Sequence, residues 1–414
     1  MRIIKLELQP ILVALRRHKL IASLLAILVA FTCAVVCNVA FMIQQRVMST
    51  QLSSGIAEHQ LIAIQSVTLD PSANQVVRHQ EDVSALRTIS GIESAAAVDT
   101  LPLDENDNAQ GTCASEQALL RAAQAQAIVG NCAQVSVYDG SPGMVKTLGL
   151  HLLAGRDFHL DEFVSGSQLD PPVAIITRAL AKKLYPNGDA LGETLYTDPD
   201  KPIRIVGIVD NVLRPSLHGS HGNYDSMFWP QYPDQSVVTY VISVATQNRA
   251  WVLKRVSTAL YQLDANRILG RPRAFAQVRA SYFQNDESMI GLLVCSALGL
   301  LLVSALGITG LSNFWVQQRM RTVGIRRALG ATRMDILRYF QIENFIIVSF
   351  GVVFGILMGI GLNLLLMVHF EVSKLPLWYL ALGAVALWIL GQLAALAPAL
   401  RASKLSPVAA TRNI

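Results

Sequence analysis

The fold class is decided by SMIGLLVCSALGLLLVSALGITGLSNFWVQQ, residues 288–318, a run of 31 residues without a charged side chain. Three further runs share this character. About 20 apolar residues, at a rise of about 1.5 Å each, cross the hydrocarbon core of a bilayer. Helices buried in a soluble protein rarely stay apolar on every face for this long. We therefore predict four transmembrane helices, at residues 20–43, 288–316, 344–370 and 377–400.

The composition agrees with a membrane protein. Of 414 residues, 52% are hydrophobic and only 15% are charged, and the mean hydropathy is +0.39. A soluble domain usually carries about 25% charged residues, so this composition argues against a wholly soluble or disordered chain. The first apolar run is longer than the roughly 7–15 apolar residues of a signal peptide. We interpret it as a retained anchor.

The basic residues predict the orientation. Residues 1–19, 317–343 and 401–414 together hold 14 Lys and Arg but only 3 acidic residues, whereas residues 44–287 hold 19 basic and 25 acidic residues. Cytoplasmic segments are enriched in Lys and Arg. We therefore predict that both termini lie in the cytoplasm, with a cytoplasmic amphipathic helix at 1–19 and a cytoplasmic tail at 401–414, and that the short loop 371–376 is exported. In a two-membrane bacterium the membrane is then the inner membrane and the exported parts are periplasmic.

Residues 44–287 are predicted to form a large periplasmic domain. Strand-like and helix-like stretches alternate along it, which indicates a mixed α/β domain of two compact lobes. Two of the five cysteines, Cys113 and Cys132, lie in this region. An oxidising compartment permits a disulfide between them, and two free thiols are the alternative. The bridge would close a loop of about 20 residues and contribute about 3 kcal/mol on the chain-entropy estimate.

No catalytic pattern is present in the sequence. His218 and His221 have an HxxH spacing, but they lie in a Pro/Gly loop without an evident third ligand, so we expect a solvated loop and no metal site. The 414 residues contain no GxxxxGK[ST] phosphate-binding loop, no GxSxG and no HExxH. We predict a protein that is not itself an enzyme, binds no cofactor or nucleic acid directly, and depends on a separate ATPase polypeptide if ATP drives it.

The predicted spans contain no Asp, Glu, Lys or Arg, which argues against an ion-coupled transporter, because such transporters bury charged groups along their path. Small residues recur instead. Gly351, Gly355 and Gly359 form a double GxxxG that is typical of a helix-packing face. The alternative is that glycine is simply common in membrane helices.

Several stretches carry a resemblance to a known family. RTVGIRRALGAT at 321–332, RMDILR at 333–338 and QIE at 341–343 resemble the signature of MacB/FtsX-type ABC transporter permeases, and APALRASKLSPV at 397–408 resembles the ending of that family. In the domain, LGLHLLAGRDF at 148–158, PVAIIT at 172–177, ALG at 190–192 and IVGIVD at 205–210 resemble the MacB-type periplasmic core domain. The family often has an acid where Thr322 stands.

The resemblance implies a type VII permease that works by mechanotransmission, without the fused ATPase of MacB. Two permease subunits, identical or related, would act with a dimer of cytoplasmic ATPase subunits that bind ATP-Mg, in contact with membrane lipid, a periplasmic adaptor and an outer-membrane duct. The cargo would be a peptide, an antibiotic or a similar molecule. The periplasmic domain would divide into a porter-like lobe (50–134 and 228–285) and an inserted lobe (135–227). Lipoprotein extraction as in LolC or LolE, and FtsX-like regulation of a periplasmic partner without transport, stay open as alternatives.

The same resemblance makes residues 323–331 the candidate ATPase-coupling segment. Val323, Ile325, Ala328 and Leu329 give an apolar stripe at helical spacing with a charged flank. A helix of this kind can lodge in a groove on a soluble partner. We expect Gly330 to end the helix in the left-handed conformation and Thr332 to start the next one. A basic interfacial helix without a partner is the alternative. The complete predicted set is Val323, Gly324, Ile325, Arg326, Arg327, Ala328, Leu329, Gly330 and Ala331.

Overall fold

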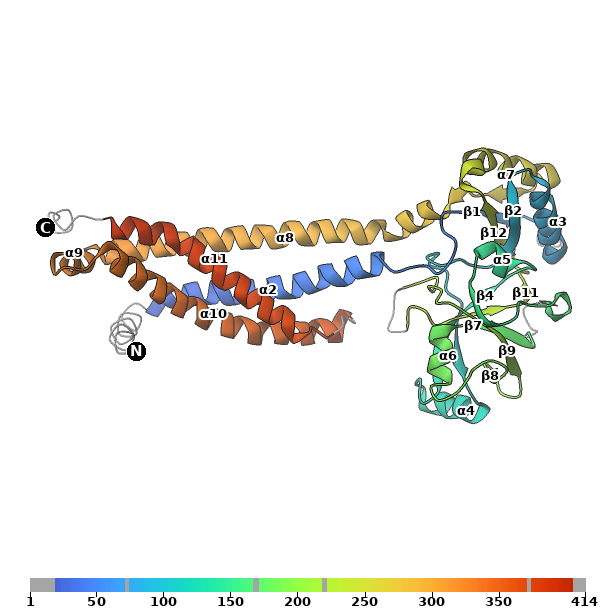
Figure 1. Ribbon diagram of the computed structural model, residues 1–414, viewed down its shortest axis with the longest axis horizontal. Coiled ribbons are helices and arrows are strands. Elements are labelled where there is room, and N and C mark those ends of the chain that lie inside the picture. The colour runs from blue at the N-terminus through green and yellow to red at the C-terminus, as the bar shows by residue number, and fades with distance from the viewer. Residues whose placement is uncertain (1–18, 71–73, 167–170, 218–221, 371–373, 405–414) are drawn as a thin grey trace. The chain divides into compact units, whose positions relative to one another are not determined.

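The computed structural model describes residues 19–70, 74–166, 171–217, 222–370 and 374–404. The predicted helix at 1–19, apart from its last residue, lies outside the described residues, as do half of the loop 371–376 and most of the tail. The chain divides into two units, which are described separately. The helical unit comprises residues 1–50 and 286–414, and the α/β unit comprises residues 51–285 (Figure 1).

Four long helices dominate the helical unit, and each is long and apolar enough to cross a membrane. The predicted spans fall within them, and the helices extend beyond the apolar runs on the sequence. Their bounds are α2 Lys19–Thr50, α8 Phe275–Gln318, α10 Arg333–Phe370 and α11 Leu377–Ser403.

The glycine face of α10 packs against α2. A Cβ atom built on Gly355 would lie 2.8 Å from the carbonyl oxygen of Ala30, and one on Gly351 would lie 2.8 Å from that of Ala26. Glycine is therefore needed for the two backbones to approach. The Asn38 Nδ2 atom on α2 donates a hydrogen bond of 3.0 Å to the Gly359 carbonyl oxygen, which ties the same two helices together.

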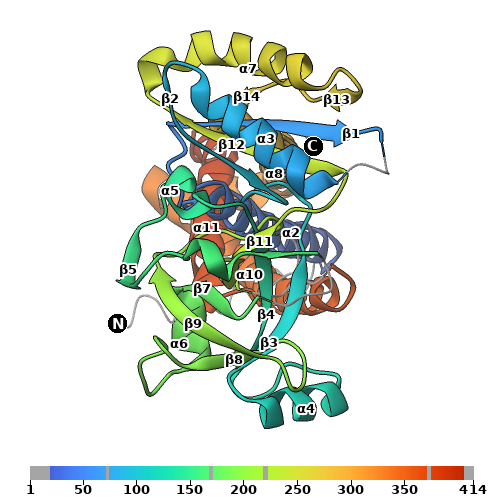
Figure 2. The same ribbon diagram turned by 90° about the vertical axis from the view of Figure 1, so that its right-hand side faces the viewer.

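The first sheet of the α/β unit is antiparallel throughout, in the order β13-β1-β12-β2, with β14 also paired to β1. One face packs against helices α3 and α7 (Figure 2). The side chains of Leu86 and Leu260 are fully buried there. Side chains alternate between the two faces of a strand, so the opposite face is formed by the intervening residues. The elements are β1 Leu61–Thr68, α3 Gln75–Thr88, β2 Ile92–Val98, β12 Val237–Val244, α7 Arg249–Leu263, β13 Arg267–Leu269 and β14 Arg273–Ala274.

The second sheet is mixed, in the order β5-β9-β7-β10-β4-β3-β8, and β8 also pairs with β9, so that six strands close into a ring. Helix α4 packs against β3 and β4, and helix α6 packs against β4, β7 and β9 (Figure 2). The elements are β3 Ala109–Cys113, α4 Glu116–Ala125, β4 Cys132–Asp139, α5 Met144–Leu148, β5 Leu152–Gly155, β7 Val173–Thr177, α6 Arg178–Leu184, β8 Thr194–Tyr196, β9 Pro202–Val209 and β10 Ser226–Trp229, with a separate pair of β6 Val164–Ser165 and β11 Gln231–Tyr232.

The two sheets divide the α/β unit at a different place from the predicted lobe boundary. Strand β3 and helix α4, which we predicted in the first lobe, belong to the second sheet, because β3 pairs antiparallel with β4 from Ala109↔Ser136 to Cys113↔Cys132. Strand β10 also lies in the second sheet, parallel to β4. By strand pairing the second lobe therefore begins at about residue 109, and the predicted boundary at 134/135 is corrected.

Candidate coupling segment between α8 and α10

A short helix, α9 Met320–Ala328, connects α8 to α10. It ends in a Schellman motif: the Gly330 N–H donates to the Arg327 carbonyl, and the Ala331 N–H donates to the Arg326 carbonyl, each at 3.1 Å. Gly330 has a φ of +99°, in the left-handed region that glycine adopts without a Cβ clash. The predicted helix end at Gly330 is therefore present.

Helix α10 begins with a reciprocal cap. The Thr332 N–H donates to an Asp335 carboxylate oxygen at 2.9 Å, and the Asp335 N–H donates to the Thr332 hydroxyl oxygen at 3.2 Å. Such a pair satisfies backbone groups that the first turn of a helix leaves without partners. The turn between α9 and α10 is therefore fixed on both sides.

The predicted apolar stripe of α9 divides between two directions. Val323 is buried against the long helices, in a cluster with Trp315, Ile336 and Phe340. Ile325 and Leu329 point outward and are 51% and 84% exposed. Ala328 is exposed as well. Residues at positions i, i+3 and i+4 share one face of a helix. The exposed apolar face of α9 is therefore formed by Ile325, Ala328 and Leu329. Val323 does not belong to this face, which corrects the predicted stripe.

The predicted charged flank of α9 holds the helix in place. The Arg326 guanidinium lies 4.4 Å from the ring centre of Tyr339 on α10, a cation–π distance. The Arg327 Nη1 atom donates to the carbonyl oxygen of Ser403 on α11 at 3.3 Å. Helix α9 is thus connected to the ends of two long helices.

A buried ion pair lies at the same turn, and sequence reasoning missed it. The Arg319 Nη1 atom, at the start of α9, donates to both carboxylate oxygens of Glu343 on α10 at 2.8 and 3.0 Å. The side chains are 10% and 3% exposed. The guanidinium also lies 4.7 Å from the ring centre of Trp315. In the sequence, Arg319 counted only as a topology charge, and Glu343 counted as a topology charge and as part of the family signature. Neither use indicated a pair, because two residues 24 positions apart leave no local pattern.

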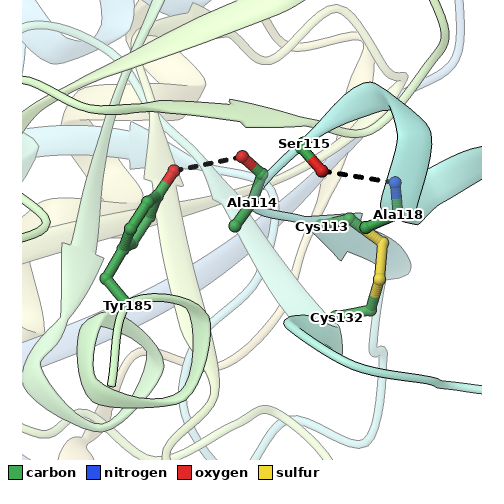
Figure 3. The surroundings of a disulfide bond; sticks show 6 residues. All are labelled: Cys113, Ala114, Ser115, Ala118, Cys132 and Tyr185. Carbon is green, nitrogen blue, oxygen red and sulfur yellow. Dashed lines mark hydrogen bonds between the residues drawn. A yellow bond between two sulfur atoms is a disulfide. The ribbon is translucent and has the colours of Figure 1, made fainter. Parts of the chain in front are cut away.

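The α/β unit contains the Cys113–Cys132 disulfide (Figure 3). It joins β3 to β4 across the hairpin that carries α4, whose first turn is capped by the Ser115 hydroxyl accepting from the Ala118 N–H at 3.3 Å. The bridge therefore links two paired strands of the second sheet, at the Cys113↔Cys132 position of their register. His218 and His221 lie outside the described residues. Within the described part of the chain, no group of three or more His, Cys, Asp and Glu side chains could hold a metal ion.

Two carboxylates meet where the sheets join. Asp99 follows β2 and Asp139 ends β4, next to the bridge between Val98 and Gly140. An Asp99 carboxylate oxygen accepts from the Thr100 N–H at 2.7 Å and from the Asp139 N–H at 2.9 Å. Burial raises the pKa of Asp99 to about 7, and burial together with the Asp99 charge raises the pKa of Asp139 well above its usual range. Near neutral pH the pair therefore holds protons that exposed carboxylates would have lost.

Comparison with known proteins gives two family matches. Residues 20–264 match the MacB-like periplasmic core domain, and residues 294–407 match the FtsX-like permease C-terminal family. The permease YknZ of Bacillus subtilis, described as an uncharacterized ABC transporter permease, is 25% identical over 285 residues, which cover 65% of this chain and 68% of YknZ. The macrolide export ATP-binding/permease protein MacB of Nitrobacter winogradskyi is 27% identical over 269 residues, covering 62% of this chain but only 40% of MacB.

Two solved extracytoplasmic domains are similar to the chain. The periplasmic region of MacB from Actinobacillus actinomycetemcomitans is 15% identical, with a TM-score of 0.34 over 55% of this chain and 94% of that one. The extracellular domain of YknZ is 12% identical, with a TM-score of 0.32 over 50% of this chain and 99% of that one. Since these scores are low, the family rests on the two family matches.

Proposed function

The chain belongs to the family of ABC transporter permeases that join a MacB-like periplasmic core domain to an FtsX-like permease region, and from this we propose that it is the permease subunit of a MacB-like ABC transporter. An ATPase subunit hydrolyses ATP-Mg in the cytoplasm. The permease transmits the resulting movement to the α/β unit in the periplasm, where it drives efflux or export of a peptide, an antibiotic or a similar cargo.

The observation that carries this proposal is the apolar face of α9. Ile325, Ala328 and Leu329 are exposed on a helix that is itself fixed to the bundle through Val323, Arg326 and Arg327. A partner that pushes on this face would move the ends of α8, α10 and α11 together. The uncharged spans support transmission of movement over passage of a polar cargo between the helices.

The working complex in this proposal contains two permease subunits and two ATPase subunits in the inner membrane. Both chain termini and α9 lie in the cytoplasm, as the basic residues predict. A periplasmic adaptor and an outer-membrane duct would carry the cargo onward. The family of the chain supports an ABC ATPase partner, and the adaptor and the duct are part of the proposal.

Replacing Ala328 or Leu329 by Asp tests the proposal. A carboxylate in an apolar contact would have to be buried without a partner, so the ATPase subunit should be lost on purification from native membranes, by about tenfold or more, at unchanged permease levels. Leu160→Asp is the matched control, because Leu160 is 77% exposed in the α/β unit. The coupling role is refuted if both α9 variants retain a subunit with a GxxxxGK[ST] motif and normal transport.

The molecules that co-purify with the intact complex separate the alternatives. An adaptor and a small exported molecule would support efflux. A lipoprotein bound to the α/β unit would support a LolC/LolE-like extraction role, and a wall hydrolase or similar periplasmic enzyme would support an FtsX-like regulatory role.

A further inference from the structure

A cavity of about 240 Å³ lies in the α/β unit, on the face of the first sheet that is turned away from α3 and α7. Its floor is apolar and its rim is charged. A water molecule takes about 30 Å³, so the cavity has room for a small headgroup and a few carbon atoms. The lining residues come from β1, β12, the loop after β2, the β13–β14 turn and the start of α8: Ala63, Gln65, Leu101, Asp104, Thr239, Gly270, Arg271, Arg273 and Val278.

Two arginines line this cavity: Arg271 lies in the β13–β14 turn, and Arg273 is the first residue of β14. The Gly270 N–H donates to the Gln65 carbonyl oxygen at 2.8 Å, and Arg273 pairs with Ala63 in the β14–β1 register, so the turn is fixed to β1 at both ends. Arg271 and Arg273 are both exposed. Within the described residues, neither guanidinium forms a salt bridge. Their donors are therefore available to an anion.

Asp104 lines the same cavity as the two arginines and lies on a strained loop. The residues on either side of it, Leu103 and Glu105, have φ values of +64° and +61°, in the left-handed region that costs a non-glycine residue about 1–3 kcal/mol. The buried side chains of Leu101 and Leu103 hold this conformation, and the Leu103 N–H donates to the Arg214 carbonyl at 3.4 Å. Such strain persists only where the surroundings enforce it, and its effect here is to place Asp104 at the cavity wall.

The charge of the cavity changes with pH. Burial raises the pKa of Asp104 to about 6, with the nearby Arg273 lowering it and Glu105 raising it. Asp99 also lies within electrostatic range of Asp104, and Arg271 lines the same cavity. Below pH 6 the wall carries two positive charges, and above it the Asp104 carboxylate opposes them.

We propose that this cavity binds the anionic end of an amphiphile, with a carboxylate or phosphate between Arg271 and Arg273 and the first apolar carbons on Ala63, Leu101 and Val278. Guanidinium groups match the geometry of both anions. This proposal goes beyond the export role, because it states that the molecule bound here, whether cargo or regulator, has an anionic end. Binding can be measured without transport.

Calorimetric titration of the full chain in nanodiscs of neutral lipid tests the site. Hexanoate and hexyl phosphate are the probes, and they distinguish a carboxylate from a phosphate source; hexanol is the uncharged control. The double variant Arg271→Gln/Arg273→Gln should bind the preferred anion at least about tenfold more weakly, because charge-assisted hydrogen bonds are lost. Arg204→Gln, at an exposed position of β9 in the other sheet, should bind as the wild type does.

The pH dependence gives a second readout. The affinity of the wild type for hexanoate, which stays mostly ionised over this range, should rise several-fold from pH 7.5 to pH 5.5, as Asp104 becomes neutral. Asp104→Asn should bind tightly at both pH values. The site is refuted if neither anion binds, if hexanol binds equally well, or if the arginine variant keeps full affinity. None of these three outcomes bears on association with the ATPase, which is measured separately with the α9 variants. They would therefore not count against the permease role.

Discussion

Glu343→Gln should destabilise the helical unit strongly. The substitution keeps the shape of the side chain but leaves the buried Arg319 guanidinium without its carboxylate, which accepts from Nη1 at 2.8 and 3.0 Å. Removing one partner of a buried ion pair costs about 3–5 kcal/mol. A unit of this size changes its unfolding midpoint by about 2–4 °C per kcal/mol. We therefore expect the midpoint to fall by roughly 6–20 °C.

The free cysteines supply the assay. Cys33 and Cys37 are buried in α2 and should react with a thiol-specific dye only when the helical unit unfolds, whereas Cys295 is exposed and is replaced by Ser to remove the background. Cys113 and Cys132 are held in the disulfide and do not react.

The double variant Arg319→Met/Glu343→Leu is the control. Replacing both charges by apolar residues of similar size should restore most of the lost stability, since such replacements are often neutral or stabilising. A cycle of Arg319→Met, Glu343→Leu and the double variant then measures the coupling between the two side chains. If the losses of the single variants simply add in the double variant, the buried pair does not fix this turn.

Three further predictions concern packing, the disulfide and pH. Gly355→Val should separate α10 from α2 and lower the unfolding midpoint of the helical unit by several degrees. Gly361→Val should have little effect, because a Cβ atom there meets nothing within 4 Å. Equal effects of the two variants would contradict the packing face. Cys113→Ser/Cys132→Ser should cost the α/β unit about 3 kcal/mol in denaturant unfolding, and Cys113 and Cys132 should resist alkylation until reduced; immediate alkylation would contradict the bridge. Because burial raises the pKa of Asp99 to about 7, the folded state keeps a proton that the unfolded state has lost. The contribution of Asp99 to the stability of the α/β unit should therefore be fully present below about pH 4 and should be lost as the pH rises through about 7. Asp99→Asn should remove this contribution from the pH profile, and identical profiles of the variant and the wild type would contradict the shift.

The sequence predicted the features that depend on local patterns. Long uncharged runs identify the spans, and Gly330 and Thr332 identify the turn between α9 and α10. Each of these signals is contained in one continuous stretch of sequence. The lobe boundary was wrong because it depends on which distant strands pair. Strand β3 joins the second sheet through β4 and β8, and no property of residues 109–113 alone reveals those partners.

The coupling segment shows the same limit at the level of single side chains. An amphipathic helix has an apolar face, but the sequence does not say whether the long helices or a soluble partner covers it. In α9 both occur: Val323 turns inward, and Ile325 and Leu329 turn outward. The inward contacts end on α8, α10 and α11. In the proposed role, a force applied to the outward face would therefore reach all three helices through close contacts, so coupling would depend on the fixed inner side of α9 as well as on its exposed side.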